Sequence, residues 1–400
     1  MSTKPKYEVA DIFRSCRPLL PPQSSHNNRV IDAIIKCRTQ EMGGHIYRCD
    51  NEACGHEEQA YNSCRNRNCP KCQYSAKELW VEERVRELLP VAYYHVVFTV
   101  PHVFNELMMY NREILYNLVF QASQEAVKTH FINKYQATPG IISLLHTWGS
   151  NISYHVHTHM LITAGGIKKA DAKMKTSEVW VDSKENYIFP VKGITEIYRA
   201  IYVKKLRKHL RKSKLKLPAS LIKYPMAIED LIDSSFKHDW VVYAAKPFLA
   251  PIHVLEYLGN YTHRIAFSNH RILKIENDRV YFTYKDYKDK EVLIKETSLA
   301  CTDFCRRYLM HVVPRGFVRI RFYGFMANKS RKKNIEKARG LIAVMDPKKE
   351  VLDSEKLAVI IEDLKLKHKT DSDLCALCKI GTMQKYQDIP KIPGFRRDSS

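Results

Sequence analysis

The chain has 400 residues, and 65 lysines and arginines against 43 aspartates and glutamates give it a formal charge of +22. Such a length predicts two or three domains, and the basic excess favours nucleic acid as the partner over an anionic membrane surface. No apolar run is long enough to span a membrane and the N-terminus lacks the apolar segment of a signal peptide, so we expect a cytoplasmic, nucleoid-associated protein whose 11 cysteines are reduced.

Residues 1–90 are predicted to form an N-terminal helical segment and a zinc ribbon. The segment 49–72 carries the tight Cys69-Pro-Lys-Cys72 knuckle and a looser pair, Cys49 and Cys54, with a glycine after it. Two such pairs about 15 residues apart can close one tetrahedral structural zinc site. We therefore expect Cys49, Cys54, Cys69 and Cys72 to bind Zn²⁺, with Cys64 as the first replacement.

Basic residues surround this knuckle. Phosphate contacts are predicted for Arg65, Arg67 and Lys71. The alternative is a purely structural ribbon that does not touch DNA.

Residues 91–275 are predicted to form an α+β core with an antiparallel sheet and a basic helical insertion. Segments 92–101 and 140–149 are rich in β-branched and apolar residues and are typical of strands. Segment 105–134 has apolar residues at helical spacing. The strand, helix, strand order leads directly into segment 154–166, YHVHTHMLITAGG, which is also predicted to be a strand.

The strand 154–166 carries His155, His157 and His159 two residues apart. Side chains at i, i+2 and i+4 of a strand share one face, so the three imidazoles line up on one surface. Neutral imidazoles in a row suit a divalent metal ion. The alternative is a polar strand face whose histidines bind water or the backbone.

Two tyrosines, Tyr257 and Tyr261, lie four residues apart in the segment VLEYLGNYTHRIAFSN. On a helix they would share one face, either for packing or for chemistry. With a divalent ion beside them, two phenols permit two successive transesterifications without an external energy source. The chain contains no Walker-type phosphate loop, which agrees with that chemistry. The basic run 203–216 is either a solvated helix face or a DNA backbone contact.

Several segments in this order resemble one transposase family. They are GGHIYRCD, YNSCRNRNCPKCQ, YHVVFTVPH, LLHTWG, HVHTHMLITAGG, YLGNYTHRIAFSNHRI and PRGFVRIRFYGFMAN. The chain resembles the two-tyrosine HUH rolling-circle transposases of the insertion-sequence-ninety-one (IS91) family, which have an N-terminal zinc-binding domain.

The resemblance implies a zinc ribbon followed by an antiparallel-sheet HUH endonuclease domain that cleaves and rejoins single-stranded DNA at element ends. It implies a 5′-phosphotyrosine intermediate with Tyr257 and Tyr261 as nucleophiles, and Mg²⁺ or Mn²⁺ as the catalytic ion. His157 and His159 are the preferred ligands of that ion, with His155 or Asn260 as a third. A non-catalytic zinc-ribbon DNA-binding protein, a metal hydrolase and an inactive transposase copy remain alternatives.

Residues 276–345 are predicted to form a small antiparallel sheet followed by a basic, DNA-contacting region. Lysines and arginines alternate there with aromatic residues, a pattern that suits single-strand binding, although a solvated face is the alternative. The predicted contacts are Arg319, Arg321, Lys329 and Arg331.

Residues 346–400 are predicted to be a charged tail. They hold one unpaired knuckle, Cys375-Ala-Leu-Cys378. Half a site cannot close a zinc tetrahedron, so Cys301, Cys305 or His368 would have to complete it, unless the knuckle is a relic.

Overall fold

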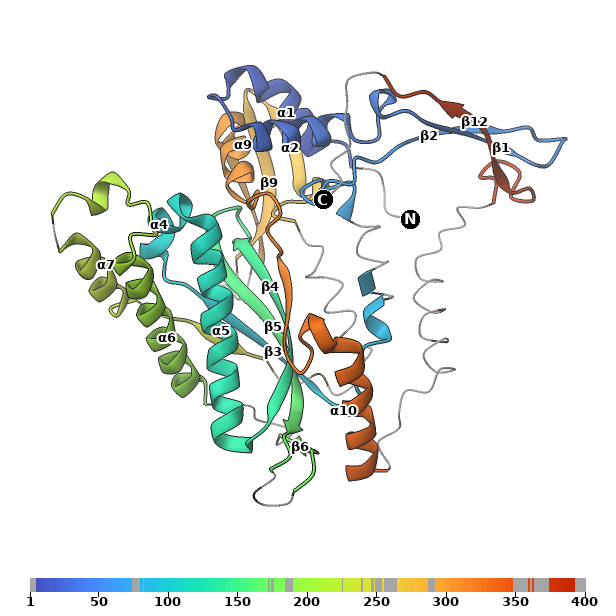
Figure 1. Cartoon of the computed structure of the whole chain (residues 1–400). Helices are drawn as coiled ribbons and strands as arrows, with labels where there is room; N and C mark the ends of the chain where they lie inside the picture. The colour runs from blue at the N-terminus through green and yellow to red at the C-terminus, as the bar shows by residue number, and fades with distance from the viewer. Residues whose placement is uncertain are drawn as a thin grey trace.

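The computed structural model describes residues 5–73, 80–81, 83–171, 173, 176–183, 190–224, 226–238, 240–245, 248, 254, 265–286, 292–347, 359, 362 and 374–392. Helices and antiparallel sheets alternate along these residues, which confirms the predicted α+β class (Figure 1). Short 3₁₀ turns connect several elements; they are Arg17–Leu19, Gln40–Met42, His102–Phe104, Ala219–Leu221, Asn269–Arg271 and Asn328–Ser330. No helix within the described residues is long and apolar enough to cross a membrane.

A central antiparallel sheet organises the molecule. Its strands lie in the order β11 (Ile320–Gly324), β4 (Thr138–Trp148), β5 (Tyr154–Lys168), β3 (Tyr93–Thr99) and β7 (Val242–Ala244), and β6 (Val179–Asp182) pairs with β5. The strands predicted at 92–101, 140–149 and 154–166 are thereby confirmed. β5 lies between β3 and β4, so its side chains are supported by a neighbour on each side.

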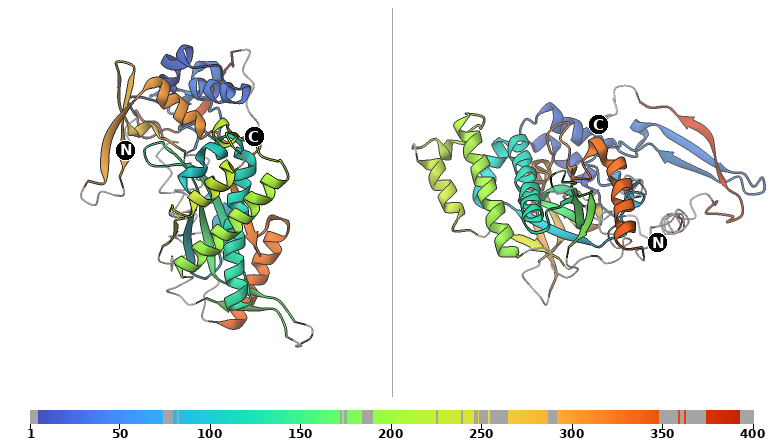
Figure 2. Two further views of the ribbon diagram at one scale, coloured as in Figure 1. Left: turned by 90° about the vertical axis from the view of Figure 1, so that its left-hand side faces the viewer. Right: turned by 60° about the horizontal axis from the view of Figure 1, so that its bottom comes forward.

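Four helices cover one face of this sheet: α4 (Asn105–Tyr110), α5 (Arg112–Tyr135), α6 (Val191–Arg211) and α7 (Ala227–Ser235) (Figures 1 and 2). Val156, Met160 and Ile162 of β5 pack with the apolar side of α5 in the main core. Because these residues alternate with the histidines along the strand, burying them turns His155, His157 and His159 to the opposite face.

Among the described residues, the second face of the sheet is covered only in part. Helix α10 (Arg331–Met345) inserts Ile335, Ala338 and Ile342 against Leu144 and Leu161, on the same face as the histidines but farther along the strands. At this edge Gly324 has φ +66°, and a Cβ there would lie 1.7 Å from the carbonyl oxygen of Pro139. Only glycine permits β11 to approach β4 so closely.

The N-terminal helices pack on a separate cluster. Helices α1 (Val9–Cys16) and α2 (Ser25–Lys36) share a core with α9 (Cys301–Met310) and with the sheet β10 (Ile294–Ala300), β9 (Arg279–Lys285) and β8 (Ile272–Glu276). Trp148, at the end of β4, belongs to the same core. The end of the histidine-bearing sheet is therefore attached to the N-terminal region.

A third sheet, here called the arm, projects from the body (Figures 1 and 2). It consists of β12 (Met383–Ile389), β1 (Gly44–Cys49) and β2 (Glu57–Tyr61), with Gly44 opposite Ile389 in the register. The sequence predicted no strand in the C-terminal segment, because β12 has little apolar surface and its pairing partner lies more than 300 residues away along the chain.

Candidate functional site

Three histidines converge on the second face of the central sheet, opposite helices α4 to α7. His157 and His159 lie on β5, and His146 lies on β4 directly opposite His157 in the register. The ligand nitrogens of all three lie within 4.8 Å of one another. Among the described residues the structure therefore brings His146, rather than the predicted His155, to His157 and His159.

Hydrogen bonds orient two of these rings. The Nδ1 of His157 lies 3.0 Å from the carbonyl oxygen of His155, and the Nδ1 of His159 lies 3.0 Å from the Nε2 of His95. Burial lowers the pKa of His95 to about 4, so His95 is neutral near pH 7 and its Nε2 can accept a hydrogen bond from the Nδ1–H of His159. Both arrangements leave the Nε2 lone pairs of His157 and His159 directed at each other.

The spacing of these nitrogens fits a shared metal ion. The Nε2 atoms of His157 and His159 are 3.1 Å apart. Two nitrogens in neighbouring positions of an octahedral ion, each at about 2.1 Å, would be about 3.0 Å apart. The His146 ring lies with its centroid 4.6 Å from that of His159, close enough to supply a third nitrogen from the adjacent strand.

His155 belongs to the same strand face but has a different environment. Its ring centroid is 5.0 Å from that of His157 and 5.1 Å from that of His102. Burial, with a smaller contribution from the His102 charge, lowers the pKa of His155 to about 4. Its buried Nδ1 has no hydrogen-bond partner among the described atoms.

The histidines form the floor of a cleft of about 2780 Å³. The arm contributes Tyr47 and Tyr61 to its lining, and β7 contributes Tyr243, which is 57% exposed. Lys6 and Arg38 add positive charge from the N-terminal region. Aromatic surfaces and cations in one cleft are the groups that hold unpaired nucleotides, by stacking and phosphate pairing.

The predicted tyrosines Tyr257 and Tyr261, and the alternative ligand Asn260, lie outside the described residues. Their roles stay predictions. The same holds for His368 as a zinc ligand.

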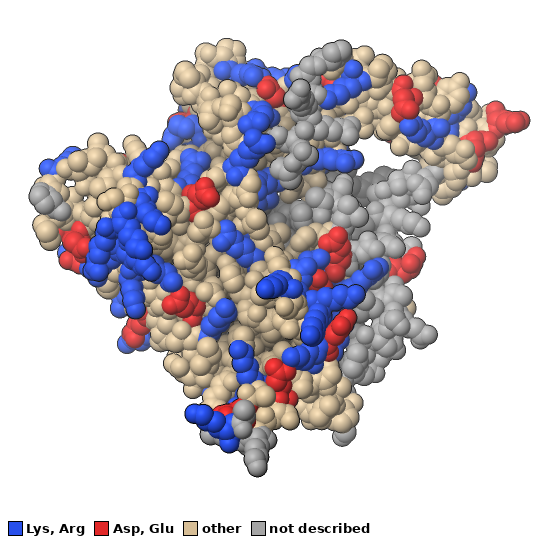
Figure 3. Space-filling view, viewed as in Figure 1, with Lys and Arg blue, Asp and Glu red and all other residues tan. Residues whose placement is uncertain are grey.

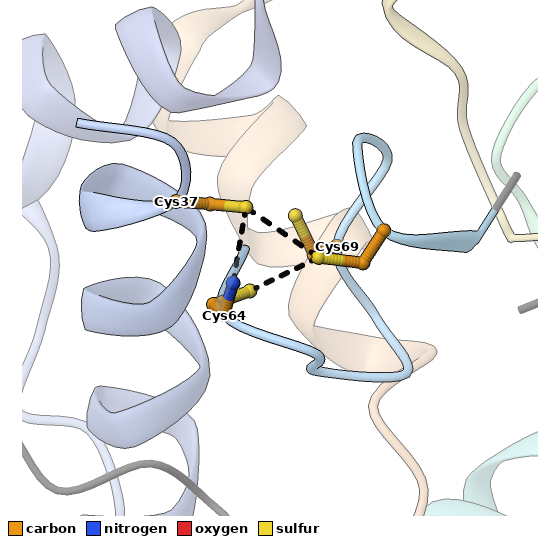
Figure 4. A group of neighbouring side chains, drawn as sticks. Cys37, Cys64 and Cys69 are labelled. Carbon is orange, nitrogen blue, oxygen red and sulfur yellow. Dashed lines mark hydrogen bonds between the residues drawn. The ribbon is translucent and has the colours of Figure 1, made fainter. Parts of the chain in front are cut away.

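The cysteines predicted to share one zinc site are divided between two clusters, which corrects the predicted ligand set. Cys69 and Cys72 lie with Cys64 and Cys37, and here this group is called the buried cluster. Figure 4 shows the side chain of Cys37, at the end of α2, pointing toward Cys64 and Cys69. The fifth predicted thiol, Cys64, is thus in this cluster together with a cysteine that the sequence analysis missed.

Cys49 and Cys54 lie instead with Cys375 and Cys378. The C-terminal knuckle, Cys375 and Cys378, is therefore completed by a second pair of cysteines. Its partners are not Cys301 and Cys305, which pack near Cys16 in the N-terminal core.

The buried cluster has the dimensions of a four-thiolate zinc site. The Sγ of Cys72 lies 3.5 Å from that of Cys37 and 3.6 Å from that of Cys64. Four sulfurs at about 2.3 Å from a tetrahedral zinc ion would lie about 3.8 Å apart. Hydrogen bonds from neighbouring thiols, that of Cys37 first, lower the pKa of Cys72 below its ordinary value.

The basic residues predicted to contact DNA mostly have structural partners. Arg67 donates to the carbonyl oxygens of Phe317 and Pro314, and Lys71 pairs with Glu8 at 2.7 Å. These bonds give both charged groups partners within the protein, and Lys71 also lines the cleft, so their phosphate contact stays a prediction. Arg65 is exposed.

In the second predicted basic group, Arg321 and Arg331 also have partners within the protein. Arg321 donates to Asn117 and its guanidinium carbon lies 4.3 Å from the Phe120 ring centroid, while Arg331 pairs with Glu87 at 3.0 Å. Arg319 is half-buried, and burial lowers its pKa to about 10. Lys329 is exposed. Within this segment, Phe317 lies beside the Arg321 guanidinium and Phe322 beside that of Arg331.

Exposed cations gather elsewhere on the surface, over α6 and beside α10 (Figure 3). The α6 set follows the basic run 203–216 and consists of Lys204, Lys208, Arg211, Lys212, Lys214 and Lys216. Helix α6 covers the face of the sheet opposite the histidines. A polyanion held there would lie across the sheet from the cleft.

Two protein-family models match separate parts of the chain. A family model described as "Transposase zinc-binding domain" matches residues 11–100, and one described as "Putative transposase" matches residues 140–334. A Sinorhizobium fredii protein named "Putative transposase y4qJ" is 37% identical over 350 residues, 85% of each chain. The "Transposase for insertion sequence element IS801" of Pseudomonas savastanoi pv. phaseolicola is 26% identical over 317 residues, 75% of this chain and 70% of the relative. No solved structure shows a significant match to the chain.

Proposed function

We propose that this chain, which belongs to the IS91 family of transposases with an N-terminal zinc-binding domain, cleaves and rejoins single-stranded DNA at the ends of a transposable element. The observation that carries the proposal is the convergence of His146, His157 and His159 in an open cleft. The buried cluster supports a structural zinc ion in the N-terminal domain.

The histidine face supports a metal-dependent site of the HUH endonuclease type. His157 and His159 would bind Mg²⁺ or Mn²⁺ through Nε2, and His146 would supply the third nitrogen. A divalent ion bound there supplies Lewis acidity, polarising a scissile phosphate and stabilising the departing oxygen. His95 and the His155 carbonyl would keep the two strand ligands in the correct tautomer and orientation.

Tyrosine would supply the nucleophile. The phenol oxygen of Tyr257 or Tyr261 attacks phosphorus, the bond from phosphorus to the 3′-oxygen breaks, and that oxygen takes a proton and leaves as a free 3′-hydroxyl. The 5′-phosphate stays on tyrosine until another 3′-hydroxyl attacks it and restores the phenol. A second tyrosine would allow a second strand to be held while the first is transferred.

Single-stranded DNA fits the cleft better than a duplex does. The lining combines exposed aromatic rings, such as Tyr243, with Lys6 and Arg38, and unpaired bases have free faces to stack on them. Of the DNA contacts predicted from the sequence, Lys71 also lines this cleft, while Arg67, Arg321 and Arg331 have partners within the protein.

The proposal is tested by incubating the protein with single-stranded oligonucleotides that carry candidate element ends, with and without Mn²⁺. We expect a covalent protein–DNA adduct on a denaturing gel. The adduct should disappear in the Tyr257→Phe/Tyr261→Phe and His157→Ala/His159→Ala double variants. It should persist in His130→Ala, a matched histidine change on α5 across the sheet. Metal-independent DNA binding with no adduct on any end would leave a non-catalytic zinc-ribbon DNA-binding protein.

A further inference from the structure

Cys49, Cys54, Cys375 and Cys378 bring together two pairs of thiols from opposite ends of the chain. We propose that this group, here called the arm cluster, binds a second structural zinc ion that fastens the C-terminal segment to the N-terminal domain. The two C-terminal ligands lie outside residues 11–100, which match the zinc-binding family model. The proposal therefore adds a metal site to the one expected for that domain, and it does not depend on the catalytic chemistry proposed above.

The sulfur positions have the geometry of a zinc tetrahedron. The Sγ of Cys49 lies 3.6 Å from that of Cys378, and the Sγ of Cys54 lies 3.7 Å from that of Cys375. These distances nearly equal the edge of about 3.8 Å expected for four sulfurs around zinc. They are far longer than the about 2.05 Å of a disulfide bond, so neither contact is a crosslink.

Both cysteine pairs sit on turns that are shaped to present sulfur. The Cys54 amide donates to Asn51, and Gly55 after it has φ +56°. On the other side, Cys378 is followed by Lys379 with φ +56°, and the Gly381 amide donates to the Cys378 Sγ at 3.4 Å. Amide donation to sulfur favours the thiolate that a metal requires.

The surrounding contacts hold the two turns in register. The carboxylate of Asp50 accepts hydrogen bonds from both the amide and the hydroxyl of Thr382, and the Asp50 amide donates to the Thr382 carbonyl. A Cβ on Gly381 would lie 2.5 Å from the Cys49 Sγ, so only glycine lets the C-terminal turn approach this closely. The close approach places all four sulfurs within 4.8 Å of one another.

Four cysteines in this arrangement select zinc. Thiolate ligands in a tetrahedral set exclude Mg²⁺ and Ca²⁺, which take oxygen ligands, and leave zinc and iron. Eight of the 11 cysteines belong to the two clusters, and the remaining three pack in the N-terminal core. We assign zinc, so iron in the purified protein would contradict the assignment.

A second zinc ion would stabilise the pairing of β12 with β1. β12 is the edge strand of the arm and is mostly exposed, so it buries little apolar surface of its own. A metal crosslink at its start compensates for that weak packing. Because β1 and β2 line the histidine cleft, the crosslink also fixes the arm that forms one wall of that cleft.

The test is the metal content of the full-length protein, measured by elemental mass spectrometry. We expect two zinc ions per wild-type chain. The Cys49→Ala/Cys54→Ala and Cys375→Ala/Cys378→Ala variants should each lose one ion, and the quadruple variant should lose no more than one. Cys16→Ala, a buried cysteine outside both clusters, should retain both. The ion that remains in the buried cluster shows that the N-terminal domain still folds.

Two zinc ions in Cys375→Ala/Cys378→Ala, or one in the wild type, would overturn the proposal. A ligand-preserving change gives an independent measurement. Gly381→Ala pushes a methyl group toward Cys49 and should weaken binding at this site roughly 10-fold to 100-fold in a chelator competition. Gly340→Ala on α10, where a Cβ meets no atom within 4 Å, should leave both affinities unchanged. Equal affinities in Gly381→Ala and the wild type would also refute the site.

Discussion

The hydrogen bond between His95 and His159 offers the sharpest test of how the histidine site is built. The variant His95→Phe keeps an aromatic ring stacked on His159, where the ring centroids are 5.3 Å apart and nearly parallel, but it removes the nitrogen that lies 3.0 Å from the His159 Nδ1. Packing is thus largely preserved and only the orienting bond is lost. We expect metal binding to weaken while the fold survives.

The expected loss of metal affinity follows from the tautomer of His159 that the His95 hydrogen bond stabilises. With a metal on Nε2, His159 must carry its proton on Nδ1, and His95→Phe removes the nitrogen that accepts that N–H, a loss that costs about 1–3 kcal/mol at a buried site. The metal-free ring can choose the other tautomer and avoids most of that cost. The difference corresponds to roughly 10-fold to 100-fold weaker metal binding, the range typical of lost outer-shell partners.

The assay is the Mn²⁺ concentration that gives half-maximal adduct formation, together with direct Mn²⁺ binding followed by electron paramagnetic resonance. His95→Phe should raise both values by that factor, and the melting temperature should change little. His102→Phe is the matched control, because His102 is exposed and its ring contacts His155 instead of the three converging ligands. An unchanged Mn²⁺ requirement in His95→Phe would refute the orienting role.

Three further predictions concern stability and zinc. Burial lowers the pKa of His311 to about 4, against about 6.5 in the unfolded chain, so its contribution to stability is complete above pH 6.5 and is lost as the pH falls toward 4. Between pH 7.5 and 5, the free energy of unfolding measured in denaturant titrations should therefore fall by about 2 kcal/mol more in the wild type than in His311→Gln. Gly324→Ala should destabilise the protein by about 2–4 kcal/mol in the same titrations, since its Cβ would collide with the Pro139 carbonyl, and a wild-type midpoint would contradict the close β11–β4 contact. A chelator should release zinc in two phases, first from the arm cluster with its half-exposed Cys54 and Cys378 and later from the buried cluster, and a single phase would count against two sites of different exposure.

Local patterns in the sequence were sufficient for the elements that position the histidines. Alternation of β-branched and apolar residues predicted β3, β4 and β5, and helical spacing predicted α4 and α5. The row of His155, His157 and His159 on one strand face followed from the two-residue period alone. These predictions succeeded because each depends on neighbours within one element.

The sequence could not predict which residues from distant segments complete the histidine and cysteine sites, because strand pairing brings them together. His146 was part of a segment correctly predicted as a strand, but its proximity to His157 depends on the β4–β5 register. Cys37 closes the buried cluster from the end of α2, and Cys375 and Cys378 reach Cys49 only because β12 pairs with β1. Spacing along the chain reveals a knuckle but not which distant knuckle completes it.

For the predicted DNA contacts, the structure shows protein partners that the sequence does not reveal. Arg67 and Arg321 lie in basic segments, yet carbonyl and amide oxygens of the protein occupy their guanidinium groups. A sequence shows the charge of a side chain but not whether a buried acceptor already satisfies it. The exposed cations on α6 and in the cleft are the better candidates for phosphate contact.

The most direct test of the central claim is to identify the atom that holds the DNA. After reaction with an end-bearing oligonucleotide, nuclease treatment and tryptic digestion, mass spectrometry should find residues 238–264 as one peptide, because the Lys246–Pro247 bond resists trypsin. We predict that this peptide carries a nucleotide 5′-phosphate on Tyr257 or Tyr261, and that the modification requires Mn²⁺ and His157. Attachment to Tyr243 or to a residue outside this peptide, or strand cleavage that leaves no covalent adduct, would contradict the tyrosine transesterification on which the account depends.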